Sequence, residues 1–326
     1  MEKKIKVALI YKKNYVFLTG NHFDNTTYFF FMHALSRSKK LEITFFPSES
    51  EFNTEKLKNK FDVILIPDNH TSGTPELVGI KKLSIPVICR VGDPHDAKRT
   101  GKLQFHDKFK IDYYFNFMHP SYFYKYYPKN FSYKTIIFGL ESSLYSKTKP
   151  FESRISNKIL ITGALGKNKI KSKIANRILN PNRSSWYFYK LRTICNDLPF
   201  VEHARDVSNK FKSDDLSFLL SQYRAAIAAT THYPTIKYME TAAAGCLTFM
   251  EITKHNHGTY LGYEDNKTAI FINENNFKDK FNEFLNDTNN PKWQKIASKG
   301  RKFTLEKLSN DNAVEHLTEL IEEIIK

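Results

Sequence analysis

The fold of this chain is decided by residues 232–250, which read HYPTIKYMETAAAGCLTFM. Residues 235–244 are rich in helix formers, Pro234 suits a first helical turn, and Gly245 is typical of the position just after a helix. The apolar run 246–250 then fits a buried parallel strand. We therefore predict a helix followed by a strand, with small alanines that let the helix pack closely on a sheet.

Glu240 is the one carboxylate on this predicted helix. The simple interpretation is that it is solvated or pairs with Lys237, one turn earlier, because ion pairs at this spacing are common and weak. The alternative is that it accepts hydrogen bonds from the hydroxyl groups of a sugar or ribose, beside a phosphate held at the start of the helix.

The same stretch resembles the nucleotide-binding helix of the GT-B glycosyltransferases, in the group 1 branch that includes the spore protein CgeB. The family core K-Y-x-E-x-x-A-x-G is supplied here by Lys237, Tyr238, Glu240, Ala243 and Gly245. The resemblance covers residues 158–326 and extends to the first half only by architecture. It implies an α/β chain of two Rossmann-like domains whose parallel sheets face each other across a cleft, and it implies that Glu240 holds ribose or sugar hydroxyls.

The length and composition are those of a two-domain globular protein. The chain has 326 residues, of which 41% are hydrophobic and 26% are charged. Its three scattered cysteines have no metal-ligand spacing, which favours reduced thiols and a cytoplasmic protein. No segment has the length and apolar character of a signal peptide or a membrane span.

The chain is strongly basic, with a formal net charge of +16. Residues 1–150 carry 24 Lys and Arg against 14 Asp and Glu, so the excess is larger in the first half. This excess favours nucleic acid or an anionic membrane surface as a partner. The alternative is a lysine-rich composition spread over solvated faces, because no block of five or more like charges occurs. Both interpretations stay open.

The first half alternates predicted strands with helices and loops. A helix is predicted at 26–36, and strands are predicted at 6–11, 41–46, 61–67, 87–91, 112–117 and 135–138. This alternation argues for a parallel α/β sheet, which binds its ligands at the carboxyl ends of the strands.

Two polar clusters, at 68–70 and 92–96, follow predicted strands. The simple interpretation is that these residues form turns. The alternative is that one cluster supplies the general base that sugar transfer with inversion needs. In GT-B enzymes the loop after the matching strand often carries a histidine or aspartate that faces the donor sugar. The resemblance therefore ranks Asp93 and His95, from the second cluster, as the catalytic residues.

The second half opens with a predicted strand at 158–162 and a loop that contains Gly163, Gly166, Lys167 and Lys169. The spacing is neither that of a P-loop nor that of a complete G-x-G-x-x-G motif. Glycines nevertheless let a backbone approach phosphate closely, and lysines favour a diphosphate. Because this loop lies beside the donor diphosphate in GT-B proteins, the resemblance implies that these four residues bind the donor.

The segment before Glu240 departs from the pattern of retaining GT-B enzymes. Those enzymes often show Glu-x7-Glu, and the position of the first glutamate is His232 here. The stereochemical outcome is therefore left open. We predict that His232, Thr235 and Lys237 join Glu240 in binding the donor.

The predicted domains follow from the strand pattern and the resemblance. They are an acceptor-side domain at 1–145, a linker at 146–157 and a nucleotide-sugar domain at 158–310. A last helix at 311–326 is expected to pack back on the first domain, as in other GT-B folds.

The predicted function is transfer of a sugar from a nucleoside diphosphate sugar to an acceptor hydroxyl in the interdomain cleft. The acceptor would be a glycan, a lipid-linked sugar or a small molecule, and peripheral contact with an anionic membrane is one expectation from the charge. No metal or other cofactor is predicted, because lysine and backbone groups would neutralise the leaving diphosphate. Two alternatives stay open: a transferase that glycosylates modified bases in DNA, and a non-catalytic nucleotide-binding or scaffold protein with the same fold.

Overall fold

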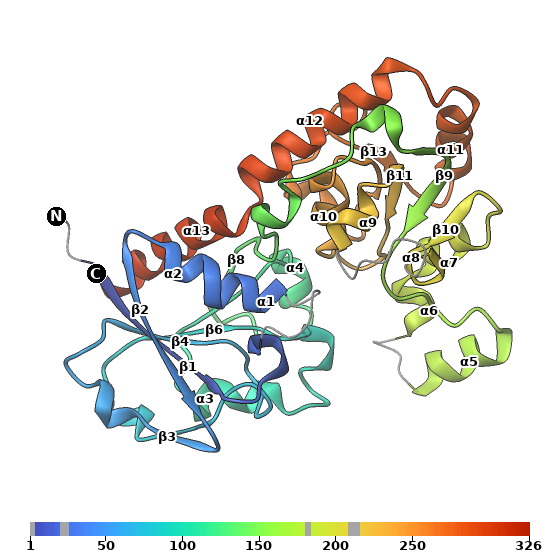
Figure 1. Cartoon of the computed structure of the whole chain (residues 1–326). Helices are drawn as coiled ribbons and strands as arrows, with labels where there is room; N and C mark the ends of the chain where they lie inside the picture. The colour runs from blue at the N-terminus through green and yellow to red at the C-terminus, as the bar shows by residue number, and fades with distance from the viewer. Residues whose placement is uncertain (1–3, 20–25, 180–183, 208–215) are drawn as a thin grey trace. The chain divides into compact units, whose positions relative to one another are not determined.

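The computed structural model describes residues 4–19, 26–179, 184–207 and 216–326 (Figure 1). The chain divides into two compact units. Unit 1 comprises Met1–Glu141 and Ser309–Lys326, and unit 2 comprises Ser142–Leu308. The predicted organisation is a first domain that ends at 145, a linker at 146–157 and a second domain at 158–310. The structure divides the chain after Glu141 and after Leu308, so the predicted linker lies within unit 2.

Unit 1 is built on a sheet of six parallel strands in the order β2-β1-β4-β6-β7-β8. The strands are β1 (Ile5–Lys12), β2 (Leu41–Ser48), β4 (Val63–Ile66), β6 (Val87–Arg90), β7 (Tyr113–Asn116) and β8 (Tyr133–Thr135). Two further strands, β3 (Glu51–Asn53) and β5 (Glu76–Val78), pair with each other. Five of the six strands predicted in the first half are confirmed, with ends that move by at most two residues. The sixth, predicted at 135–138, lies earlier in the structure, at Tyr133–Thr135, and shares only Thr135 with the prediction.

The alternation of side chains along the strands divides unit 1 into two apolar layers. Val7 and Leu9 of β1 contribute to one layer, whereas Ala8 and Ile10 contribute to the other. This division follows from the pleat, which points successive side chains to opposite faces. A sheet that is buried on both faces reads as a continuous apolar run, which is why these strands could be found in the sequence.

The predicted helix at 26–36 is confirmed as one helical run of three parts. These are α1 (Thr26–Tyr28), the π-helical segment η2 (Phe29–Ala34) and α2 (Leu35–Arg37). The wider π turn is visible in the bond from the Leu35 amide to the Phe30 carbonyl, five residues earlier. Phe30 and Phe31 of this run are fully buried in the first layer.

The last helix, α13 (Asn310–Ile325), completes the same layer of unit 1. Val314, Leu317 and Ile321 lie in the core with the residues of η2 and of the sheet. The side chain of Asn310 anchors the start of the helix, because its Oδ1 accepts a hydrogen bond of 2.7 Å from the Gly139 amide. The C-terminal helix α13 is therefore part of the same hydrophobic core as β1 and η2 near the N-terminus.

Unit 2 contains a sheet of five parallel strands in the order β10-β9-β11-β12-β13. The strands are β9 (Ile155–Ile161), β10 (Val201–His203), β11 (Tyr223–Ala228), β12 (Leu247–Glu251) and β13 (Ile270–Ile272). After β9 the chain adds β10 on one side of it and then adds β11, β12 and β13 in turn on the other side. The direction in which strands are added therefore reverses between β9 and β11. In open parallel sheets such a reversal opens a crevice at the carboxyl ends of the strands.

The remaining α-helices are short in unit 1 and longer towards the end of unit 2. They are α3 (Phe105–Lys108), α4 (Pro120–Phe123), α5 (Ile170–Leu179), α6 (Ser185–Phe188), α7 (Lys190–Asn196), α8 (Ala204–Val207), α9 (Leu216–Leu220), α10 (Lys237–Ala243), α11 (Phe277–Asn286) and α12 (Pro291–Lys307). Among the described helices, none combines the length and the apolar character that crossing a bilayer would need.

The helix and strand predicted at 232–250 are α10 and β12, with one correction. The helix begins at Lys237 rather than in the turn that contains Pro234. A tight turn precedes it, because the amide of Tyr238 bonds to the carbonyl of Thr235 at 3.0 Å, three residues earlier. Gly245 follows the helix at φ +76°, the left-handed conformation expected of a glycine there.

Candidate functional site

The candidate site of unit 2 lies at the carboxyl ends of β9, β10 and β11, where the strand order reverses. The loop after β9 begins at Gly163, which has φ +90°. His203, the last residue of β10, holds this loop through a contact of 2.9 Å between its Nε2 and the Gly163 carbonyl oxygen. The strand reversal and this loop place backbone groups where doubly wound folds bind phosphates.

Arg192 on α7 lies directly beside this loop. Its Nη1 donates a hydrogen bond of 3.1 Å to the Ala164 carbonyl. A Cβ atom at Gly163 would lie 2.7 Å from that same Nη1. A side chain at position 163 would force the guanidinium to shift, and the left-handed backbone at this position also favours glycine.

Arg192 is buried, at 2% exposure, yet most of its hydrogen-bonding capacity is unused. Within the described part of the chain, its Nε and Nη2 have no hydrogen-bond partner, and its guanidinium lies 4.9 Å from the Tyr189 ring. By contrast, Arg224, also buried, donates through Nε, Nη1 and Nη2 to four oxygen atoms. Burying hydrogen-bond donors without acceptors costs free energy. The Nε and Nη2 of Arg192 could therefore donate hydrogen bonds to a bound anion.

Lys237 approaches Gly163 from the other side. Its Cε would lie 3.9 Å from a Cβ atom at Gly163, and its Nζ lies 2.8 Å from Glu240 Oε2. Pairing with Lys237 was the simple interpretation of Glu240, and the structure shows this pair. Glu240 is not solvated, however, because it is only 5% exposed. The pair is a buried element of the site rather than a surface ion pair.

Three threonine hydroxyls at the same edge of the sheet also lack partners among the described residues. They belong to Thr162 after β9, Thr231 after β11, and Thr235 before α10. Unpaired buried polar atoms are rare in folded proteins and call for a specific explanation. Together with Arg192, these hydroxyls form a set of polar groups that a bound polar ligand would satisfy.

Glu251 ends β12 at the carboxyl edge and is 4% exposed. Its burial, reinforced by the charge of Glu274, raises the pKa of Glu251 to about 7, while Arg192 and Lys190 act in the opposite direction. Burial likewise lowers the pKa of Arg192. The charge next to Arg192 therefore depends on pH in the neutral range.

The other loop residues predicted to bind the donor have different surroundings. The amide of Gly166 already donates to Thr193 Oγ1 at 2.8 Å, and a Cβ atom at Gly166 would lie 2.7 Å from the Trp186 Cα. Lys167 and Lys169 are exposed side chains. The structure thus brings Gly163 together with Lys237 and Glu240, whereas the roles of the other three loop residues stay predictions.

His232 is held in an aromatic cluster just before α10. It is 9% exposed, its Nδ1 lies 3.2 Å from His255 Nε2, and its ring centroid lies 4.8 Å from that of Phe188. The position at which retaining enzymes carry a glutamate is therefore occupied here by a packed imidazole. Its predicted contact with the donor stays a prediction.

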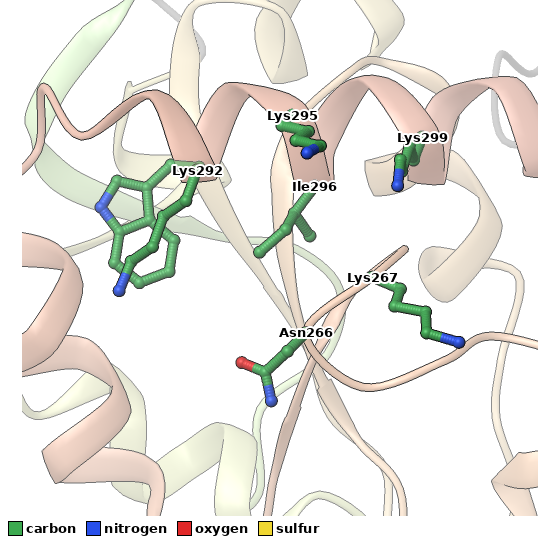
Figure 2. A pocket seen from close by; sticks show the side chains of 7 residues that line it. Asn266, Lys267, Lys292, Lys295, Ile296 and Lys299 are labelled. Atoms are coloured by element: carbon green, nitrogen blue, oxygen red, sulfur yellow. The ribbon is translucent and has the colours of Figure 1, made fainter.

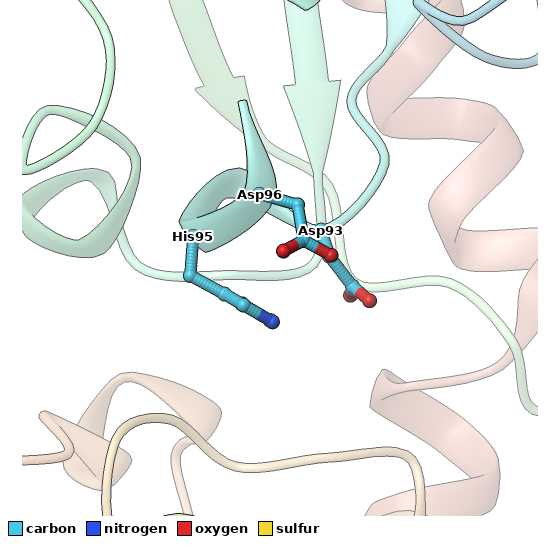
Figure 3. Close-up of side chains that lie close together, drawn as sticks. All are labelled: Asp93, His95 and Asp96. Carbon is cyan, nitrogen blue, oxygen red and sulfur yellow. The ribbon is translucent and has the colours of Figure 1, made fainter. Parts of the chain in front are cut away.

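The predicted catalytic residues lie in unit 1, on the turn η5 (Pro94–Asp96) and the residue before it (Figure 3). Ligand atoms of Asp93, His95 and Asp96 all lie within 4.8 Å of one another, close enough to share a metal ion. Asp96 is paired with Arg99 at 3.1 Å. The Asp93 side chain is exposed, and the catalytic roles of Asp93 and His95 stay predictions. The prediction that no metal takes part stays a prediction.

The other polar cluster of unit 1 is structural. The Tyr15 hydroxyl donates to Asp68 Oδ2 at 2.8 Å, and Asn69 Nδ2 donates to the Tyr127 hydroxyl at 2.7 Å. Asp68 and Asn69 are buried, and Asp68 Oδ1 has no hydrogen-bond partner among the described residues. These bonds join residues 68 and 69 to distant parts of unit 1.

Arg192 and Glu251 were missed in the sequence. The signal for Arg192 was weak: it stands between Leu191 and Thr193 on a short helix whose inner face is apolar. A charged residue on such a face is unusual and could have been noticed. Nothing local distinguishes Glu251 from an ordinary residue at the end of a strand.

A pocket of about 300 Å³ lies elsewhere in unit 2, beside α12 (Figure 2). It is lined by Asn266, Lys267, Lys292, Trp293, Lys295, Ile296 and Lys299. Two of its lysines are engaged in ion pairs, Lys267 with Glu264 at 2.5 Å and Lys292 with Glu283 at 2.7 Å. The pocket shares no residue with the site around Gly163, and we assign it no role.

Residues 175–319 match the model of a family described as glycosyl transferase-like. No curated protein sequence matches the chain. Many solved structures are similar to it, including the following three. A glycosyltransferase from Rickettsia africae is 10% identical, with 100% of both chains covered and a TM-score of 0.56. Anabaena HepE in complex with UDP-glucose is 10% identical, with 98% of this chain and 100% of that chain covered and a TM-score of 0.54.

The third is an alpha-glucosyltransferase in complex with UDP-glucose and DNA containing an abasic site. It is 10% identical, with 98% of this chain and 100% of that chain covered and a TM-score of 0.57. A longer protein, the pneumococcal O-GlcNAc transferase GtfA, is matched over 57% of its own length. Identity at this level establishes the fold, and the CgeB-like branch stays a prediction. The chain therefore has the GT-B fold of the glycosyltransferases, and its residues 175–319 form a glycosyl transferase-like region.

Proposed function

We propose that this protein transfers a sugar from a nucleoside diphosphate sugar to an acceptor hydroxyl. The observation that carries the proposal is the buried guanidinium of Arg192, which has two nitrogens without hydrogen-bond partners in the described structure and lies against Gly163. A diphosphate supplies the charge and the several acceptor oxygens that such a group lacks. The fold supports the proposal, because structures of HepE and of an alpha-glucosyltransferase with this fold contain UDP-glucose.

In this proposal the diphosphate lies over Gly163, between Arg192 and Lys237. Lys237 then exchanges part of its pairing with Glu240 for the phosphate, and the Glu240 carboxylate accepts hydrogen bonds from ribose or sugar hydroxyls. The two cations stabilise the negative charge that grows on the leaving diphosphate as the glycosidic bond breaks. Their action requires no metal ion.

Asp93 is the proposed general base. Its exposed carboxylate takes the proton of the acceptor hydroxyl as the oxygen attacks the sugar carbon. His95 is oriented by the Tyr122 hydroxyl, 3.2 Å from its Nδ1, and is proposed to face the reacting sugar. Asp93→Asn should therefore abolish transfer and leave nucleotide binding intact.

Thermal unfolding with a panel of UDP, GDP, ADP, dTDP and CMP sugars, with and without magnesium, tests the donor site. We expect one nucleotide class to raise Tm, because a ligand that binds only the folded state stabilises it. Arg192→Gln should weaken the binding of that nucleotide by about tenfold or more, since the substitution removes charge-assisted hydrogen bonds to phosphate. The Tm of the free Arg192→Gln protein should fall only slightly, because Nη1 is the one lost nitrogen that has an acceptor, the Ala164 carbonyl.

Arg224→Gln is the matched control, since Arg224 is buried in the same unit and uses its donors within the chain. It should lower the Tm of the free protein and keep the nucleotide-induced shift. Absence of a shift with every nucleotide at millimolar concentration would contradict the donor site. Binding without release of nucleoside diphosphate, over a panel of acceptors, would instead support the non-catalytic alternative.

A nucleic acid acceptor is the second candidate. The net charge of +16 favours it, and one structure with this fold contains DNA. It predicts that duplex DNA with modified bases accelerates release of nucleoside diphosphate, and that this effect falls steeply with salt.

A further inference from the structure

Residues 153–196 form a segment of unit 2 without a single acidic residue. They contain ten Lys and Arg residues and no Asp or Glu. Arg154 and Arg192 of this set are buried, whereas Lys167, Lys169, Lys171 and Arg177 are exposed, and exposed charge of one sign attracts anionic surfaces. The helix α5 lies within it, and Figure 1 shows α5 extending away from the strands of its own unit.

α5 presents large apolar side chains to solvent. Ile170, Ile174 and Ile178 are 74%, 57% and 73% exposed, and Leu179 is 76% exposed. None of the ten residues of the helix is buried. The three isoleucines recur every four residues and therefore form one stripe along the helix. Soluble proteins seldom leave such a stripe uncovered unless something binds it.

Cations border the stripe on both sides. With about 100° between successive residues, Lys171 follows the stripe on one flank and Arg177 precedes it on the other. Both side chains are exposed. An apolar stripe with flanking lysine or arginine is the pattern of helices that lie flat in a bilayer interface.

The opposite side of α5 is fixed to its own unit. Lys173 Nζ lies 3.3 Å from the centroid of the Trp186 ring, and the Ser185 amide donates to Asn176 Oδ1 at 3.4 Å. These half-buried contacts turn the isoleucines away from α6. The stripe is therefore presented by a helix that is already formed and anchored.

We propose that α5 docks this protein on the surface of an anionic lipid bilayer. The isoleucines enter the boundary between headgroups and acyl chains, while Lys171 and Arg177 contact lipid phosphates. Nucleic acid would satisfy the charges but offers no apolar surface to four exposed aliphatic side chains, so the bilayer is the better match. The helix lies on the membrane and does not cross it. This inference does not depend on the donor site.

Flotation of the full chain with vesicles tests the proposal. We expect binding to vesicles of phosphatidylcholine with 30% phosphatidylglycerol (about a third anionic lipid, enough for a negative surface potential), little binding to pure phosphatidylcholine, and weaker binding at high salt. Ile174→Asp with Ile178→Asp should reduce partitioning about tenfold or more, and so should Lys171→Glu with Arg177→Glu. Both positions of each pair are exposed, so the variants should fold, which their Tm values would verify.

Two control variants test whether membrane binding depends on α5 or on the net positive charge of the whole protein. Lys295→Glu with Lys299→Glu makes the same change of charge on exposed residues of α12, and Ile325→Asp alters an isoleucine that is 38% exposed on α13. Both should keep wild-type binding. The proposal is overturned if anionic vesicles are not bound, or if the α5 and α12 charge variants lose binding equally. It is also overturned if duplex DNA is bound instead and the isoleucine variants bind it normally.

Discussion

Arg192 shows how a single residue can identify a site that its sequence neighbours do not. Buried arginines are normally tolerated because carbonyl and carboxylate oxygens surround them, as Arg224 illustrates. Arg192 has one such bond, to the Ala164 carbonyl. The folding cost of leaving the other donors unpaired is offset only when an anion binds. A residue that is costly for stability alone is therefore best explained by ligand binding.

Glu251 gives a prediction for the dependence of stability on pH. Its pKa is raised to about 7 in the folded chain, from an ordinary value of 4.5. Between these values the folded carboxyl keeps a proton that the unfolded one has lost, so the free energy of unfolding falls as pH rises from about 4.5 to about 7. Glu251→Gln should remove this loss and stabilise the protein at pH 8 by about 1–3 kcal/mol.

Urea unfolding at pH 5 and pH 8 checks this prediction. The advantage of Glu251→Gln should be much smaller at pH 5 than at pH 8. Glu319→Gln, which changes an exposed glutamate, should show no difference between the two pH values. Equal effects of Glu251→Gln at both pH values would mean that the Glu251 carboxyl does not titrate in this range. Since a protonated Glu251 does not repel phosphate, nucleotide binding should also tighten below pH 7.

At the scale of elements, the loop between β9 and α5 has two glycines with different tasks. Gly163 leaves space for Arg192, whereas Gly166 lets the loop rest on the backbone of Trp186 and Ser185. Gly163 therefore lies beside the buried Arg192, whereas Gly166 packs against α6, and the donor-binding role of both stays a prediction. The family resemblance implies that both bind the donor.

Gly166→Ala should therefore act mainly on stability. Its new Cβ would lie 2.7 Å from the Trp186 Cα and 2.8 Å from the Ser185 carbonyl oxygen, so the loop or α6 must shift. We expect a loss of about 1–3 kcal/mol in the free energy of unfolding, measured in urea. Lys167→Ala, an exposed change in the same loop, should stay within about 0.5 kcal/mol. Similar values for the two variants would show that the loop accommodates the methyl group.

At the scale of the whole molecule, the core of unit 1 is built from both ends of the chain. α13 supplies Leu317 and Ile321, both fully buried, to the layer that Phe30 and Phe31 also form. Unit 1 is thus not a continuous stretch of sequence. Its stability should depend on residues that follow all of unit 2.

Leu317→Ala tests this dependence. Deleting a fully buried leucine side chain leaves a cavity, and we expect a loss of about 2–5 kcal/mol in the free energy of unfolding. Ile325→Ala, at a partly exposed position on the same helix, should cost much less. Far-UV circular dichroism in urea measures both. Equal losses would indicate that α13 does not contribute to the core as described.

Much of the fold could be predicted from the sequence. Buried parallel strands such as β4 and β6 are continuous apolar runs, and α10 with β12 follows from helix formers, Gly245 and a second apolar run. These signals are local, because side-chain periodicity and backbone conformation are set by neighbouring residues. The boundary at Pro234 was missed because a tight turn and a first helical turn favour the same residue.

The sequence by itself determined the class of the fold, the order of its elements and, through Lys237 and Glu240, the region of the candidate site. Only the tertiary structure decided that Arg192 meets Gly163 and that the isoleucines of α5 are uncovered, whereas the packing of the last helix on the first domain was already expected from the family resemblance. The physical reason is that burial and pairing arise between segments far apart in the chain. A local sequence pattern indicates the chemical properties of a residue, and only the folded chain shows which other residues it contacts.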